Sequence, residues 1–377
     1  MSSSNGDRPN RNRRAVAGRG AVSRPPGRFA REHRIPIVEA AVGPDAMAED
    51  HVAPSPATQV ADEIARRLIT SNQSPDVFFE RSINPYRGCE HGCVYCYARP
   101  YHAYMDLSPG LDFETRLFAK RNAGECLRRE LAARSYRCEP VCIGTATDCY
   151  QPIERGLRIT REIIQILAEC RHPFSLITKS ALVERDLDLI APAAAAGTAA
   201  VYVTVTCLDP ALARAWEPRA AAPWRRIEAI RRLAEAGVPV GVMVAPIAPF
   251  LNDTDIEAVI EAAARAGARS AHYTMLRLPN ELLEVFTDWL RERFPDRAER
   301  VMARIRDLRG GRLNDPSFHG RMRGEGIWAD LIARRFSIAV KRHGLVTGRA
   351  NLRTDLFVPP RPGPESADGD GLQASLF

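Results

Sequence analysis

The chain has 377 residues, of which 45% are hydrophobic and 26% are charged, and its mean hydropathy is −0.25. This composition excludes a wholly disordered chain, a collagenous fibre and a small disulfide scaffold. A chain of this length can form either one large domain with tails or two domains, because single α/β barrels routinely exceed 200 residues.

The formal charge of +7 is concentrated at the amino-terminal end. Residues 1–34 carry nine arginines against Asp7 and Glu32, so the rest of the chain has no net charge. Such a basic arm is either a solvated, solubilising tail or a handle for the phosphates of nucleic acid. Residues 1–50 are also rich in Gly, Pro and Ser and are predicted to form a disordered arm. Residues 359–377 are predicted to form a second, mobile tail.

All nine cysteines lie between Cys89 and Cys207, and no secretory signal precedes them. We therefore predict a cytoplasmic protein whose closely spaced cysteines are metal ligands or catalytic thiols rather than disulfides. The uncharged run 189–208 has the length of a membrane span, but its proline, glycine and polar side chains favour a helix end, a turn at Gly197 and a buried strand. No membrane association is expected.

Apolar, β-branched runs alternate with helical patterns through the middle of the chain. The predicted strands are 140–147, 174–180, 200–206, 238–247 and 270–278. Buried strands separated by helices of about 10 to 15 residues are typical of βα units in a parallel sheet. With an earlier unit at about 82–135, the sequence predicts six units, in a doubly wound sheet or in a closed or partly closed barrel. Ligands lie at the carboxyl ends of the strands in either case.

The stretch that carries most chemical information is 84–100, NPYRGCEHGCVYCYARP, which spaces Cys89, Cys93 and Cys96 as CxxxCxxC. Thiolates are soft ligands and select zinc, copper(I) or an iron–sulfur cluster. Three ligands leave a tetrahedral zinc site incomplete, whereas a cubane cluster with three protein ligands keeps one iron open, so the ligand count favours the cluster. His91 lies inside this loop and is either a fourth ligand or an exposed loop residue.

The CxxxCxYC loop at the first βα connection, followed by five more units, resembles the radical S-adenosylmethionine (radical SAM) superfamily. This resemblance covers about residues 82–290 and implies a partial (β/α)6 TIM-type barrel. In that family the three cysteines bind a [4Fe-4S] cluster whose open iron chelates S-adenosyl-L-methionine (SAM), and one-electron reduction gives a 5′-deoxyadenosyl radical that abstracts hydrogen from substrate. A reductant such as a ferredoxin or flavodoxin is the expected partner. The implied division is an arm at 1–50, a core barrel at 51–290, a helical extension at 291–358 and a tail at 359–377.

Within the superfamily, the loop is most similar to the spore photoproduct lyase-like branch, because Tyr95 precedes the last cysteine and Tyr97 follows it. In that lyase, which acts on DNA, tyrosines are implicated in relaying a hydrogen atom, so the resemblance implies catalytic roles for both tyrosines. A cysteine in a Cys-Thr-Ser-Asp stretch donates hydrogen there, and the counterpart at 145–148 begins with Thr145. We therefore expect the branch but not the photoproduct repair reaction, with nucleic acid as one candidate substrate.

The resemblance also assigns contacts to SAM at the strand ends. Tyr95 belongs to this set, as do Gly144, Thr145 and Asp148, which take the position that binds the methionine amino group in the family. Lys179 ends the next strand and is expected to pair with the SAM carboxylate as a point charge. The structural alternative is that Lys179 pairs with Asp148 or with Glu184.

The ribose and adenine are expected at the next two strands. Thr204 or Thr206 would reach the ribose hydroxyls, and the apolar run 242–247 would flank the adenine. Both threonines have a structural alternative, because threonine favours strands in general. Glu217 follows the first of these strands and either lines the substrate opening or caps the next helix.

The sequence thus predicts a radical SAM enzyme, lyase-like or oxidoreductase, whose substrate is unassigned. The alternative is a non-enzymatic module in which the cysteine loop binds zinc or a cluster and staples the fold. Oligomeric state and the fate of SAM, consumed or regenerated, leave no trace in the sequence.

Overall fold

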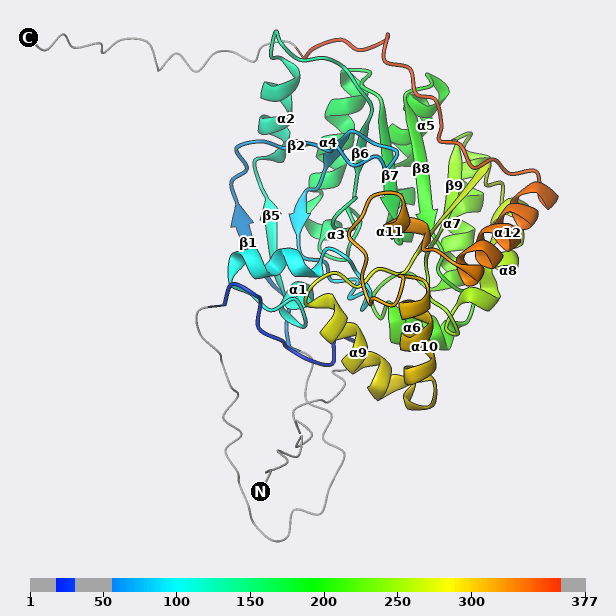
Figure 1. Cartoon of the computed structure of the whole chain (residues 1–377). Coiled ribbons are helices and arrows are strands. Elements are labelled where there is room, and N and C mark those ends of the chain that lie inside the picture. The colour runs from blue at the N-terminus through cyan, green and yellow to red at the C-terminus, as the bar shows by residue number, and fades with distance from the viewer. Residues whose placement is uncertain (1–17, 31–55, 361–377) are drawn as a thin grey trace, which may run out of the picture.

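Six parallel strands form the centre of the molecule, and they neighbour one another in chain order (Figure 1). The computed structural model describes residues 18–30 and 56–360. The parallel strands are β3 (Arg81–Ile83), β6 (Val141–Ile143), β7 (Phe174–Thr178), β8 (Ala199–Thr204), β9 (Val240–Ile247) and β10 (Ser270–Met275). A short antiparallel strand, β2 (Ile69–Ser71), lies outside β3. The parallel sheet predicted from the alternating pattern is confirmed.

Helices connect successive strands and cover one face of the sheet (Figure 1). The longer ones are α2 (Ala123–Leu131), α4 (Ile159–Glu169), α5 (Leu187–Ala195), α6 (Pro210–Trp216), α7 (Pro223–Glu235) and α8 (Ile256–Arg265). The short ones are η1 (Arg99–Met105), α1 (Asp112–Thr115), α3 (Glu154–Leu157), η2 (Ala181–Asp186) and η3 (Asp253–Asp255). The run 189–208 contains the end of α5, a left-handed Gly197 with φ of 78° and the buried strand β8, as predicted.

The two faces of the sheet differ in chemistry because side chains alternate along each strand. Toward the helices, aliphatic side chains such as Val201 and Val203 join the main hydrophobic core. The other face carries polar and aromatic groups, including Tyr202 of β8 and His272 of β10. Phe78 packs on both, with ring centroids 5.3 Å and 6.0 Å away, so the segment before β3 reaches across this inner face.

A second, three-stranded sheet was not predicted. It consists of β1 (Gln59–Glu63), β5 (Arg116–Lys120) and β4 (Tyr86–Arg87). β1 runs parallel to β5, and β4 pairs antiparallel with it. Hydrophobic alternation along the sequence does not indicate this sheet, because β1 is almost wholly exposed and β4 is only two residues long. Since β4 ends two residues before Cys89, this sheet fixes where the cysteine loop begins.

The predicted disorder of residues 1–50 is wrong for residues 18–30. Arg19 is buried, and its guanidinium donates to the Glu114 carbonyl at 2.9 Å. The N–H groups of Gly20 and Ala21 donate to the Glu114 carboxylate at 2.9 Å and 2.8 Å. Backbone hydrogen bonds, rather than an apolar stripe, hold this segment, so its composition did not reveal it. The predictions for residues 1–17, 31–50 and 361–377 concern residues outside the described ranges.

The carboxyl-terminal part is helical up to residue 342. It contains α9 (Leu282–Arg293), α10 (Pro295–Asp307), α11 (Gly320–Arg323) and α12 (Ile327–Arg342). α9 packs on α10 and, through Trp289, on Trp216 of α6 at 5.6 Å between ring centroids, while α12 packs on α8. In the ranges that the structure describes, no helix combines the length and the hydrophobicity needed to cross a membrane.

We expect His172 to make the protein less stable in mild acid. The ring is fully buried; Nδ1 lies 3.0 Å from the Pro173 carbonyl and so donates, and Nε2 accepts from the Tyr136 hydroxyl at 2.7 Å. Burial lowers the pKa of His172 to about 4. The unfolded chain therefore binds this proton more readily, and stability is complete above about pH 6.5 and is lost as the pH falls toward 4.

The measurement is denaturant unfolding at pH 7 and pH 5 for the wild type and His172→Gln. The histidine accounts for about 2 kcal/mol of the stability lost by the wild type between these pH values, and the variant should lack this part. An exposed histidine variant, His319→Gln, serves as the control. Equal losses in wild type and His172→Gln would contradict the assignment.

Candidate active site

The cysteine loop follows β4, and backbone hydrogen bonds within the loop and to a neighbouring segment hold it. Cys89 N–H donates to the Phe113 carbonyl at 2.9 Å, and Cys96 N–H donates to the Cys93 carbonyl at 3.2 Å. Gly92 has a left-handed φ of 67°, which a side chain would strain. Cys89 and Cys93 are buried and Cys96 is half-buried, so the loop holds its three thiols away from bulk water.

Burial raises the pKa of all three thiols, that of Cys93 to about 12. The Asp148 carboxylate, and after it the neighbouring Cys93 and Cys96, raise the pKa of Cys89 further, whereas the Lys179 ammonium lowers the pKa of Cys93. Metal ligation requires thiolates, and a bound cationic centre would supply the missing stabilisation. The donor set therefore fits a thiolate-ligated group.

Among the described residues, no three His, Cys, Asp or Glu side chains are gathered closely enough to hold a single metal ion. A cluster of four irons is larger than one ion, and its thiolate ligands stand farther apart. In the described part of the chain, the three cysteines therefore do not form a single-metal site.

His91 is not the exposed loop residue that was one of its two expected roles. It is buried with 2% of its surface exposed, and its Nδ1 lies 3.2 Å from a carboxylate oxygen of Asp148. Asp148 also accepts from the Thr178 hydroxyl and the Lys179 N–H, each at 2.7 Å. Burial alone would raise the pKa of Asp148, but His91 and these donors lower it. The predicted SAM contact Asp148 therefore has a carboxylate that ties the cysteine loop to the ends of β6 and β7.

Gly144 and Thr145 form the turn that ends β6. Gly144 has a φ of 88°, and a Cβ there would lie 2.6 Å from the Ile177 carbonyl oxygen, so only glycine fits. Asn84 Nδ2 donates to the Thr145 hydroxyl at 3.1 Å. The Thr145 carbonyl accepts from the hydroxyl of Tyr97. This turn is therefore bound to the residues on both sides of the cysteine loop.

Tyr95 is fixed by residues that sequence analysis did not assign to the site. Its hydroxyl donates to Glu217, which also accepts from Arg226, and both charged groups are almost fully buried. The ring lies 4.8 Å from that of Trp216, and the ammonium of Lys179 lies 5.8 Å from the Tyr95 centroid. Glu217 thus neither lines an opening nor caps a helix. The sequence separations of Tyr95 and Arg226 from Glu217 follow no motif, which is why this group was missed.

Lys179 does not make the ion pairs proposed as its structural alternative. Only its backbone N–H reaches Asp148, and Glu184 pairs with Arg225 and Arg232 instead. Burial lowers the pKa of Lys179, but the charges of Cys93, Glu217 and Asp148 outweigh it and raise that pKa overall. The ammonium therefore stays charged beside the cysteine loop.

Thr204 and Thr206 lie at the carboxyl end of β8, and both are buried. Their carbonyls accept from Arg226 at 3.1 Å and from the Asn252 amide at 2.7 Å. The structure thus places the predicted residues at one end of the sheet, with Cys93, Tyr95 and Lys179 brought together and the two threonines packed behind them.

A model of the radical SAM superfamily matches residues 83–263. An uncharacterized protein of Mycobacterium tuberculosis is 38% identical over 248 residues, which are 65% of this chain and 72% of that protein. The chain belongs to the radical SAM superfamily. An uncharacterized protein of Methanocaldococcus jannaschii is 28% identical over 174 residues, or 46% of this chain and 62% of that protein.

Solved structures similar to this radical SAM protein include spore photoproduct lyase complexed with dinucleoside spore photoproduct. The TM-score is 0.52 at 15% identity, over 76% of this chain and 81% of that one. At this identity the similarity shows the fold alone, and it confirms the predicted partial (β/α)6 TIM-type barrel. As a member of the superfamily, the chain has a [4Fe-4S] cluster and SAM as its cofactors.

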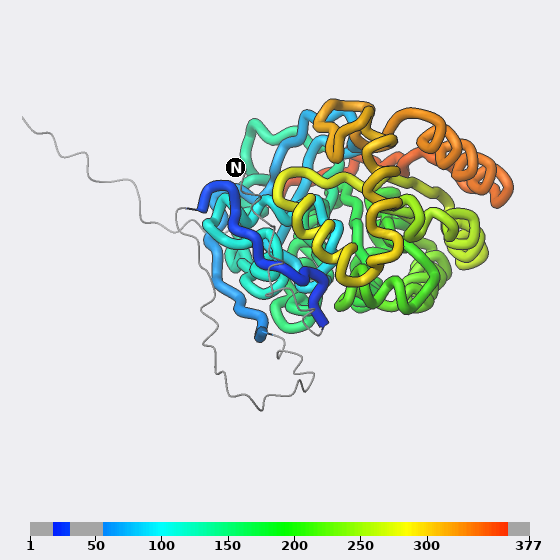
Figure 2. Tube along the Cα trace, turned by 60° about the horizontal axis from the view of Figure 1, so that its bottom comes forward, coloured from blue at the N-terminus to red at the C-terminus, as the bar shows by residue number. Residues whose placement is uncertain are grey.

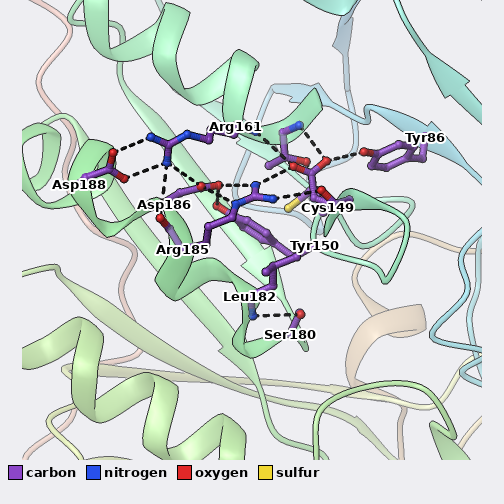
Figure 3. Close-up of polar contacts among 11 residues, drawn as sticks. Tyr86, Cys149, Tyr150, Arg161, Ser180, Leu182, Arg185, Asp186 and Asp188 are labelled. Carbon is purple, nitrogen blue, oxygen red and sulfur yellow. Dashed lines mark hydrogen bonds and ion pairs between the residues drawn. The ribbon is translucent and has the colours of Figure 1, made fainter. Parts of the chain in front are cut away.

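A network of ion pairs around the buried carboxylates of Glu154 and Asp186 links the segments that follow β6 and β7 in this radical SAM barrel (Figure 3). Arg161 and Arg185 converge on Asp186, which also accepts from the Tyr150 hydroxyl at 3.0 Å. Arg185 further donates to the Glu154 carboxylate at 2.8 Å. The hydroxyl of Tyr86, three residues before Cys89, donates to the same carboxylate, so the network joins the cysteine loop to the helices behind β6 and β7.

We expect Glu154→Ala to destabilise the protein strongly. The carboxylate is fully buried and also accepts from the Thr160 N–H at 3.0 Å, so its removal leaves buried donors unpaired. Loss of one partner of a buried ion pair costs about 3–5 kcal/mol. Denaturant unfolding at neutral pH measures the change, with the exposed Glu235→Ala as control. A loss below about 1 kcal/mol would contradict the role of Glu154 as a central acceptor.

Proposed function

We propose that this chain is a radical SAM enzyme whose cluster is held by Cys89, Cys93 and Cys96 and which uses SAM to abstract a hydrogen atom from a substrate. The observation that carries the proposal is the grouping of three thiols on one loop, two of them buried and one half-buried, with the charged Lys179 beside Cys93. Membership of the superfamily supports the chemistry, and the geometry supports these residues as its site.

When bound, the reduced cluster supplies the electron that splits SAM into methionine and a 5′-deoxyadenosyl radical, which takes a hydrogen atom from substrate. The part played by the protein is to bind SAM and to orient it. Lys179 offers a positive point charge for the SAM carboxylate. Tyr95 is held by Glu217 and packed on Trp216, so its ring has a fixed position beside the Lys179 ammonium. Fully buried Val94 keeps water from the interior of the loop.

Tyr97 is proposed as a residue on the substrate side. It is 39% exposed, unlike Tyr95, and its hydroxyl is anchored on the Thr145 carbonyl. The guanidinium of Arg277 lies 5.1 Å from the centre of the Tyr97 ring. Because Tyr97 directly follows Cys96, a substrate that contacts this ring lies next to the cluster loop.

The test of the enzyme compares wild type with Cys93→Ala after anaerobic reconstitution with iron and sulfide. We expect dithionite and SAM to give 5′-deoxyadenosine with the wild type and only background with the variant, since loss of one of three ligands prevents stable cluster binding. Cys170→Ala is the matched control, because this buried cysteine lies in the main core. Full iron content in Cys93→Ala would refute the ligand assignment, and zinc without iron in the wild type would favour the non-enzymatic module.

A nucleic-acid strand is the substrate class that the surface favours. Exposed aromatic side chains lie beside arginines on one rim, which consists of Phe29, Tyr97, Tyr101, Tyr104, Arg277 and Phe318. Arg28 and Arg321 also contact these rings, but they are already paired with Glu281 and Asp76. Phe29 lies 5.0 Å from Tyr104, and the Arg277 guanidinium lies 5.1 Å from the centre of the Tyr97 ring. Aromatic rings stack on bases and arginines bind phosphates, which is the composition of a single-strand binding surface.

Tyr104→Ala should weaken binding of a fluorescent single-stranded oligonucleotide by about 5- to 100-fold through lost stacking. Arg277→Ala should weaken it and lower the slope of log affinity against log salt by about one. Anisotropy at two salt concentrations measures both, with Arg353→Ala as control because Arg353 pairs with Asp355 at the surface.

A chain with Arg8, Arg11, Arg13 and Arg14 changed to Ser tests the basic arm separately. Affinities that none of these changes alters would argue against a nucleic-acid substrate.

A further inference from the structure

Residues 18–30, named the strap here, cross the surface beside the cysteine loop (Figure 2). Further along the strap, the Ser108 hydroxyl donates to the Pro25 carbonyl at 2.6 Å, and Arg28 pairs with Glu281 of the segment before α9 at 3.1 Å. The strap is therefore fastened at several points and spans from the loop to the carboxyl-terminal helices.

The closest contact is between two backbones. A Cβ placed on Gly20 would lie 1.8 Å from the carbonyl oxygen of Gly92, so no other residue fits at that position. Gly92 is just as confined, because a Cβ there would lie 2.7 Å from a carboxylate oxygen of Glu114. Strap and loop thus touch directly at the residue before Cys93.

One carboxylate fastens both segments. Glu114 is fully buried and accepts from the N–H groups of Gly20 and Ala21. It also forms an ion pair with the fully buried Arg99 at 2.5 Å. Arg99 in turn donates to the Gly92 carbonyl at 3.1 Å and to the Cys93 carbonyl at 2.9 Å. Through these bonds, Glu114 couples the strap to the carbonyls of the turn that carries Cys93.

The strap also closes the apolar surroundings of the loop. Ala21 and Val22 are 1% and 5% exposed and belong to the same hydrophobic cluster as Cys93, Val94 and Tyr95. Apolar side chains without free hydrogen-bonding groups exclude water from the surface that they cover. Removal of the strap would therefore open this side of the loop to solvent.

We propose that residues 20–22 are a positioning element of the cluster site: they hold the turn at Gly92 and Cys93 and shield the cluster on the Cys93 side from water, chelators and oxygen. This inference rests on the proposed role of Cys93 as a cluster ligand. Gly20 acts through the loop and touches no reacting atom, so its effect is on cluster lifetime rather than on the chemical step.

The test is Gly20→Ala in the full-length, cluster-loaded protein, with Gly156→Ala as matched control because a Cβ at Gly156 meets no atom within 4 Å. Two rates are measured: anaerobic transfer of iron to bathophenanthroline disulfonate, and bleaching of the cluster absorbance in air. We expect both to rise about tenfold in Gly20→Ala through easier local opening, and to stay unchanged in the control. Rates equal to wild type in Gly20→Ala would overturn the proposal.

Hydrogen exchange on the cluster-free full chain tests the positioning independently of iron. Amides in residues 88–97 should exchange faster in Gly20→Ala than in wild type, since the strap holds the loop by itself. Equal exchange would overturn the positioning role, even if the wild type bound no iron and the proposed function had failed. Should Gly20→Ala not fold, Arg19→Ala carries the same expectations, because it removes the bonds to Glu114, Pro56 and Thr58 without adding atoms.

Discussion

Buried ion pairs around the cysteine loop are the interaction on which the site depends. The loop has no helix or strand of its own between Arg87 and Arg99, so its conformation is imposed from outside. Two buried ion pairs do this, Arg99 with Glu114 and Arg226 with Glu217, and His91 Nδ1 adds a contact to the Asp148 carboxylate at 3.2 Å. A buried charge without its partner is strongly destabilising, which makes each pair hold its position closely.

These pairs also set the electrostatics that a cluster would meet. Glu217 and Asp148 are acceptors that remain negative, since their pKa values are lowered by Arg226 and His91 against the effect of burial. Lys179 lies among them and stays protonated. The Lys179 charge lowers the pKa of the Cys93 thiol, whereas burial and the Glu217 charge raise it, so the pKa stays above its usual value. A bound cationic centre would favour the thiolate further.

The sequence predicts those features that depend on a regular spacing of neighbouring residues. Alternation of strands and helices was sufficient for the six parallel strands, and the spacing of Cys89, Cys93 and Cys96 was sufficient to locate the candidate site. The sequence did not reveal which residues hold that loop, because Glu114 lies 94 residues from Gly20 and Glu217 lies 122 residues from Tyr95. Polar contacts over such separations have no period, and a buried histidine such as His91 looks like any loop histidine until its partner is known.

The strap also reduces the number of arginines in the basic arm that can bind a nucleic acid. Arg19, Arg24 and Arg28 contribute to the positive charge of the first 34 residues, but in the folded protein Arg24 and Arg28 pair with Asp112 and Glu281, and Arg19 is buried and donates to the main-chain carbonyl of Glu114. Charge already paired within the protein releases few counterions when a nucleic acid binds. Any phosphate contact from the arm must therefore come from its other arginines. The rim around Arg277 is the better candidate for binding a nucleic-acid strand, because there the Arg277 guanidinium lies 5.1 Å from the centre of the exposed Tyr97 ring, directly after Cys96.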